Sequence, residues 1–101
     1  MQRLVEQPID DGEVFDKAVP VGPVHYHLAV YQHFSDVEGE SVPANVEVEG
    51  HITPLDELDM RGHHRSGSEL TLRLADGRTL EFSLTDEEGR IRSTGRGLFR
   101  E

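Results

Sequence analysis

The sequence predicts an all-β protein, a small antiparallel barrel or sandwich of about five to seven strands. Apolar and polar residues alternate with a period of two over residues 24–34, 42–52, 70–74 and 80–84, which is typical of strands with one buried face. Short segments rich in Gly, Asp and Glu separate most of these strands. Because a single open sheet would leave its apolar face in water, the sheet must close on itself or pack on a second sheet.

The chain of 101 residues is long enough for one core, so we expect a single β domain over residues 1–101. Residues 1–23 are expected to be partly irregular, because Pro8, Pro20 and Pro23 interrupt them and proline is poorly tolerated in central strands. One short strand is expected around residues 13–19.

The two longest alternating segments, residues 24–34 and 42–52, predict two long neighbouring strands joined by a loop over residues 35–41. The pattern changes at Thr53, which suits a helix N-cap, and Pro54 suits the first helical position. The sequence therefore predicts one short helical turn near residues 54–61, ended by Gly62. Residues 63–67 would then form a loop.

The last third of the chain predicts a three-stranded meander whose register follows from parity. A three-residue loop over residues 75–77 pairs Leu72 with Leu80 and keeps both on the apolar face, whereas a two-residue turn would pair Leu72 with Glu81. Gly77 would then take the left-handed position of this loop. A four-residue loop over residues 86–89 pairs Leu84 with Ile91 in the third strand.

Charge is distributed unevenly along the chain, whose net charge is −10. Residues 1–60 carry thirteen acids and two bases, whereas residues 61–101 carry seven acids and eight arginines. This acidic excess argues against nucleic-acid binding through phosphates and favours a basic partner or a cation. The later arginines are expected to neutralise acids of the first half, or to face the acidic half of a second copy; they are Arg73, Arg90, Arg92, Arg96 and Arg100. Arg78 is expected to extend outward from the apolar side.

The sequence predicts a cytoplasmic protein that does not bind membranes. It has no cysteine and no apolar run of the roughly eighteen residues that a membrane span needs. The first residues lack the apolar core of a signal peptide.

Three histidines and one acid form the candidate metal site, with zinc as the expected ion; they are His25, His27, Glu49 and His51. If the two long strands pair with Phe34 opposite Val42, His27 faces Glu49 and His25 faces His51. A slip of two residues changes the partners but keeps the group on one face. Cross-strand Cβ separations of about 5 Å suit convergence on one ion.

We therefore expect a small binding module that uses its acidic surface or a sheet edge to hold a protein partner with a basic surface, or a second copy of itself. No nucleophile motif or phosphate-binding loop occurs, so no catalytic residue is assigned and an enzyme is disfavoured. A metal-binding protein, with zinc-hydrolase chemistry at the histidine cluster, is the first alternative. A small barrel that holds an apolar ligand is the second.

Overall fold

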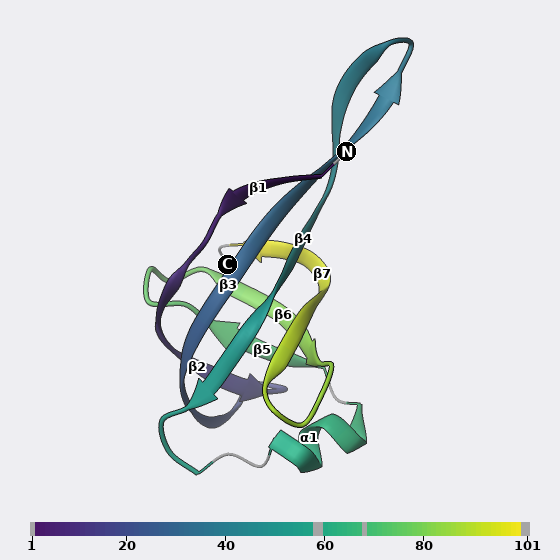
Figure 1. The fold of residues 1–101 in the computed structure, drawn as a ribbon. Helices are drawn as coiled ribbons and strands as arrows, with labels where there is room; N and C mark the ends of the chain where they lie inside the picture. Colours follow the sequence, from purple (N-terminus) through teal and green to yellow (C-terminus); the bar gives the residue numbers. More distant parts are fainter. Residues whose placement is uncertain (1, 58–59, 68, 100–101) are drawn as a thin grey trace.

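The computed structural model describes residues 2–57, 60–67 and 69–99 (Figure 1). The described residues form seven strands and one short helix. In chain order they are β1 (Gln2–Glu6), β2 (Ile9–Asp16), β3 (Val19–Val37), β4 (Glu40–Pro54), α1 (Met60–Ser66), β5 (Leu70–Arg73), β6 (Thr79–Leu84) and β7 (Arg90–Phe99). All pairings between strands are antiparallel, which confirms the predicted fold class.

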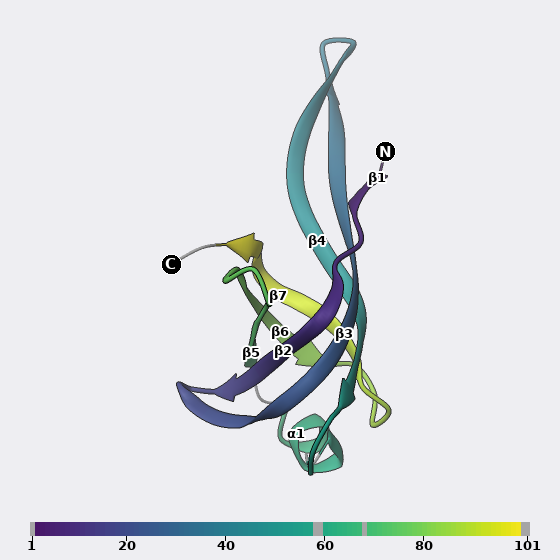
Figure 2. The same cartoon turned by 90° about the vertical axis from the view of Figure 1, so that its left-hand side faces the viewer.

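Six of the strands form a closed ring. The sheet order is β1-β3-β2-β5-β6-β7-β4, and an additional pairing between β3 and β4 closes the run of six strands from β3 to β4. Strand β1 lies outside the ring and pairs with β3 beyond the end of β2, so that Gln2 is opposite His33. The fold is therefore barrel-like, and the long strands β3 and β4 extend well past the ring (Figure 2).

The first 23 residues are more regular than we expected, because they form β1, β2 and the start of β3. Strands β2 and β3 are joined by a two-residue turn in which Lys17 and Ala18 both have positive φ, 50° and 71°. Neither residue is one of the glycine or asparagine types that mark such turns, so the sequence carried no local signal for this hairpin. Pro20 and Pro23 are both within β3, opposite residues of β2.

Strands β3 and β4 form one long hairpin in place of the predicted loop over residues 35–41. Its two-residue turn is Glu38-Gly39, both with positive φ, and Val37 pairs with Glu40. The register then shifts by one residue between Phe34–Pro43 and Gln32–Val46. This β-bulge restores the parity that turns the apolar side chains of the inner part of β4 toward the core.

The helix lies later in the chain than predicted, because residues 54–57 are not helical. Pro54 pairs with Val24 at the end of β4, and the Leu55 backbone N–H donates to the Pro23 carbonyl at 3.0 Å, which continues the sheet ladder. Residues 58–59, part of the predicted turn, lie outside the described residues. The predicted loop over 63–67 is mostly helix α1, and Gly67 donates to the His64 carbonyl at 3.2 Å just after its end.

The meander of β5, β6 and β7 has the predicted register. Leu72 pairs with Leu80 and Leu84 pairs with Ile91. Gly77 has a φ of 92°, and its N–H donates to the Leu74 carbonyl at 3.1 Å. The three-residue loop is thus a turn that requires one left-handed residue, which glycine adopts without steric cost.

Apolar side chains from both halves of the chain fill the interior of the ring. Those that are completely buried are Val14, Val24, Leu28, Val48, Ile52, Leu72, Leu80 and Phe82, each 0% exposed. Tyr26 is also buried, and its hydroxyl accepts a hydrogen bond from the Ala75 N–H at 3.2 Å. The alternative of an apolar ligand inside the barrel stays a prediction, and these side chains occupy the interior it would need.

An ion pair links β1 to the loop between β5 and β6. Both carboxylate oxygens of Glu6 accept from the Arg78 guanidinium, at 2.9 and 2.5 Å, and Arg78 also donates to Asp76. Arg78 thus turns outward as predicted, and it neutralises an acid of the first half. Its hydrogen bonds hold the pKa of Glu6 below the ordinary value of 4.5.

We expect this pair to make stability depend on pH in the acid range. Because the pKa of Glu6 is lowered by folding, its contribution is fully present above pH 4.5 and is lost as the pH falls through the folded-state pKa. The difference in melting temperature between the wild type and Glu6→Gln should therefore be largest above pH 4.5 and shrink below it. Thermal melts across this range measure the difference, and a constant value would contradict the assignment.

Candidate functional site: an acidic arm and a histidine face

The outer part of the β3–β4 hairpin projects beyond the ring as a two-stranded ribbon (Figures 1 and 2). We call residues 34–46 the arm. The molecule measures 50 × 28 × 21 Å, and the arm accounts for its elongation. On β4, strand β7 pairs with Glu49, Gly50 and His51. Nearer the turn, the described residues of β7 contact β4 only up to Val46, so the β4 edge of the arm is not paired with a second strand among them.

The arm is acidic because residues 18–60 contain no lysine and no arginine. Asp36, Glu38 and Glu40 are exposed at its tip, and none of them forms an ion pair with a described residue. Val37 and Val42 are also on the arm, with 53% and 40% of their surface exposed. The arm thus combines uncompensated negative charge with exposed apolar side chains.

Arg73, Arg90 and Arg92 make contacts close to the ring, and the acids at the arm tip have no counter-charge among the described residues. Arg92 contacts Glu47 at 2.9 Å, as the predicted neutralisation of the first half requires. Arg90 instead lies 3.8 Å from Asp86 of its own half, and the Arg73 guanidinium stacks 4.7 Å from the Phe15 ring centre. The side chain of Arg96 and all of Arg100 lie outside the described residues.

The predicted metal-site residues lie on the outer face of β3 and β4, in the slipped register. His27 is directly opposite His51, whereas His25 pairs with Thr53 and Glu49 pairs with Ala29. The specific pairing with Phe34 opposite Val42 is therefore corrected, because the tight turn and the β-bulge together move the register by two residues. As predicted for a slip of two residues, His25, His27, Glu49 and His51 remain on the same face of the sheet.

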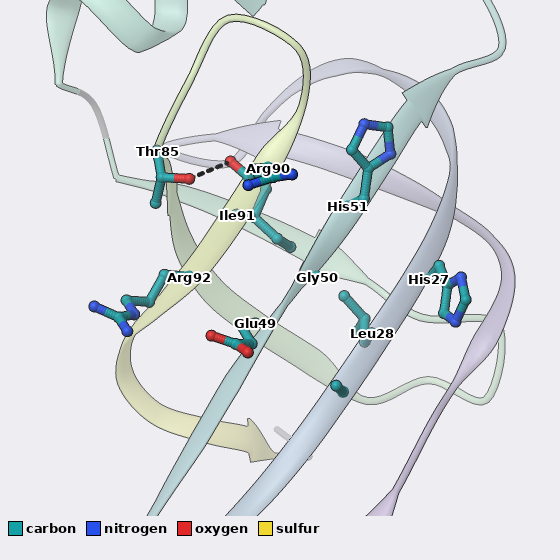
Figure 3. A pocket seen from close by; sticks show the side chains of 10 residues that line it. His27, Leu28, Glu49, Gly50, His51, Thr85, Arg90, Ile91 and Arg92 are labelled. Carbon is teal, nitrogen blue, oxygen red and sulfur yellow. Dashed lines mark hydrogen bonds between the residues drawn. The ribbon is translucent and has the colours of Figure 1, made fainter.

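Two of the three histidine rings have partners elsewhere. His25 Nδ1 lies 2.8 Å from Asp11 Oδ1 on β2, and His51 Nε2 lies 2.8 Å from the Glu88 carbonyl, to which it donates. The rings of His27 and His51 do not point toward one another (Figure 3). Within the part of the chain that the structure describes, no three His, Cys, Asp or Glu side chains are arranged to hold a metal ion. Zinc binding by the four residues stays a prediction.

A shallow hollow separates the histidines from two arginines of β7 (Figure 3). Ala29 and Gly50 contribute little side-chain volume to it, while longer side chains surround it: His27, Glu49, His51, Arg90 and Arg92. Gly50 is required there because a Cβ atom would lie 2.3 Å from the His27 carbonyl oxygen. Sequence reasoning missed both arginines, since only the long-range pairing of β4 with β7 brings them to this face.

Beside the hollow, contacts among three polar side chains connect the strands at the base of the arm. Glu47 Oε1 on β4 forms an ion pair with Arg92 Nε of β7 at 2.9 Å, and its other carboxylate oxygen lies 2.9 Å from His33 Nε2 of β3. The side chains of Glu47 and His33 are both partly buried. Three strands are thus joined at the point where the arm leaves the ring.

No protein-family model, curated protein or solved structure matches this chain. None of the described residues form a helix that is both long and apolar enough to cross a bilayer.

Proposed function

We propose that this protein is a binding module whose acidic arm holds a partner protein with a basic surface. The observation that carries this proposal is the arm itself: a ribbon beyond the ring, acidic at its tip, in a segment with no lysine or arginine between residues 18 and 60. Opposite charges on two surfaces attract each other before contact and select the partner. Exposed Val37 and Val42 supply apolar area that a partner would cover.

A basic partner is favoured over a second copy of the chain. Two copies each carry a net charge of −10 and repel one another at long range. Two of their described arginines are also held in ion pairs close to the ring, Arg92 with Glu47 and Arg78 with Glu6. The acids at the arm tip of one copy would therefore meet few uncommitted cations on another.

Charge reversal at the arm tip tests the proposal. We expect the triple variant Asp36→Lys, Glu38→Lys, Glu40→Lys to weaken binding of a fluorescent decalysine peptide by about tenfold or more at low salt. Wild-type binding should itself weaken as salt screens the charges from about 50 to about 300 mM. Fluorescence anisotropy gives both dissociation constants.

A matched variant separates the arm from the overall charge. Asp16→Lys, Glu57→Lys, Glu88→Lys makes the same change in net charge at acids away from the arm, and none of the three side chains forms an ion pair with a described residue. We expect less than about a threefold loss from this control. Equal losses from the two triples, or no binding of decalysine by the wild type, would refute a binding role for the arm.

A further inference from the structure

We propose that the β4 edge over residues 41–47 accepts an extended basic segment of the partner as an additional antiparallel strand. This inference rests on the proposed function and specifies how the partner is held. An exposed strand edge presents unpaired N–H and C=O groups that can pair with another chain. On β4, residues 40–43 and 46–47 pair with β3 on one side, and β7 begins to pair on the other side at Glu49.

The backbone of β4 is oriented to donate at this open edge. The Val48 N–H points toward β7, where it donates to Ser93 Oγ at 3.0 Å. Backbone N–H groups in a strand alternate between its two edges, and the register is unbroken from Val46 to Val48. The Val46 N–H therefore points to the same edge, where β7 makes no strand pair. Gly97 of β7 packs against the Val46 side chain, so an added strand would meet the end of β7 at this residue.

The negative charge of the arm favours a basic strand at this edge over a strand from a second copy of the protein. Natural sheets usually protect an open edge with lysine, proline or a bulge. Here Pro43 and the bulge between Pro43 and Val46 limit pairing, but every charged side chain of the arm is acidic. Pairing between two copies would bring like charges together, whereas a strand that carries arginine or lysine would gain favourable cross-strand pairs.

The outer face of the edge also specifies a residue pattern. Val42 pairs with Ser35 and Glu40 pairs with Val37, so Glu40 and Val42 lie on one face of the arm. Glu47 lies on the same outer face, opposite Tyr31. The side chains of an added strand that lie on this face would be every second residue of it. The pattern expected there is apolar side chains beside Val42 and a basic side chain at each end.

A heptapeptide of this pattern, Arg-Thr-Val-Thr-Val-Thr-Arg with blocked termini, tests the proposal on the intact protein. We expect its largest effects on amide resonances of ¹⁵N-labelled protein at residues 41–47, with smaller effects on β1, which pairs only with β3 among the described residues. An analogue that is N-methylated at alternate residues keeps the charge but cannot pair through its backbone. It should bind about tenfold more weakly or worse.

The same comparison can be made from the protein side. Val46→Pro removes the outward N–H without removing a bond to β3, and Val5→Pro places proline on the β1 edge as the matched control. We expect the first to weaken peptide binding by about tenfold and the second by less than about twofold. Circular dichroism checks the fold of both variants, and the N-methylated peptide keeps the test valid if either variant unfolds.

The outcomes distinguish the inference from the function on which it rests. If both peptides bind equally and both lose affinity with salt, strand addition is wrong and the acidic arm still binds basic partners through charge. If resonances shift at β1 or only at the arm tip, the β4 edge is not the binding element. If neither peptide nor decalysine binds at low salt, the proposed function itself fails.

Discussion

Replacing Gly50 with alanine is expected to reduce the free energy of unfolding by about 3 kcal/mol or more, the upper end for overpacking. A Cβ atom at this position would lie 2.3 Å from the His27 carbonyl oxygen and 2.9 Å from the Leu28 Cα. Both are backbone atoms, so no side-chain rotation relieves the clash. Gly50 pairs with Leu28 on β3 and with Ile91 on β7, which places the strain where the ring is closed.

Urea denaturation measures the loss for Gly50→Ala, and Gly22→Ala serves as the control. A Cβ atom at Gly22 would lie 3.7 Å from the Glu57 carbonyl oxygen, an ordinary van der Waals distance. We expect the control to change stability by less than about 1 kcal/mol. Hydrogen exchange should also accelerate at residues 48–52 in Gly50→Ala. Equal stability of the two variants would show that β4 and β3 can separate locally at little cost.

The second large effect is expected from Phe82→Ala, which should cost about 3–5 kcal/mol. Phe82 is the largest of the fully buried side chains and is 0% exposed. It lies in β6, opposite Leu70 on one side and Ser93 on the other, so the cavity would open in the middle of the meander. In a domain of this size that loss would lower the melting temperature by roughly 12–40 °C.

Val42→Ala is the matched control for Phe82→Ala, since Val42 is 40% exposed on the arm. Its removal should change stability by less than about 0.5 kcal/mol. Calorimetry or chemical denaturation resolves the difference. A loss near 1 kcal/mol for Phe82→Ala would mean that the ring collapses around the cavity and that its packing is less specific than the structure shows.

Local patterns predicted the parts of this protein in which neighbouring strands follow one another closely. The register of β5, β6 and β7 depends on parity and loop length, and both can be read from residues 70–91. The β2–β3 turn is different, because Lys17 and Ala18 adopt left-handed conformations that nothing in their residue types indicates. The helix was predicted too early in the sequence for a related reason. The Leu55 N–H donates to the Pro23 carbonyl, a partner distant in sequence, and this hydrogen bond prolongs the sheet.

In the candidate site, too, the sequence predicted the shared face but not the contacts of the individual side chains. The alternation of residues 24–34 and 42–52 put His25, His27, Glu49 and His51 on one face, and the structure agrees. The pairing of His27 with His51 depended on a β-bulge, which no local pattern marked. The engagement of His25 by Asp11 and of His51 by the Glu88 carbonyl depended on β2 and on the loop before β7.

By itself, the sequence determined the antiparallel β class, the meander, the buried faces and the acidic first half, because side-chain alternation and charge are local properties of the chain. The tertiary structure alone decided that the ring closes, since this requires β4 to meet both β3 and β7. It also decided that the β3–β4 hairpin extends beyond the ring, and that Arg78 and Arg92 form ion pairs near the ring while the arm tip stays acidic. These features are pairings between distant residues, and their energies depend on positions that only the folded chain brings together.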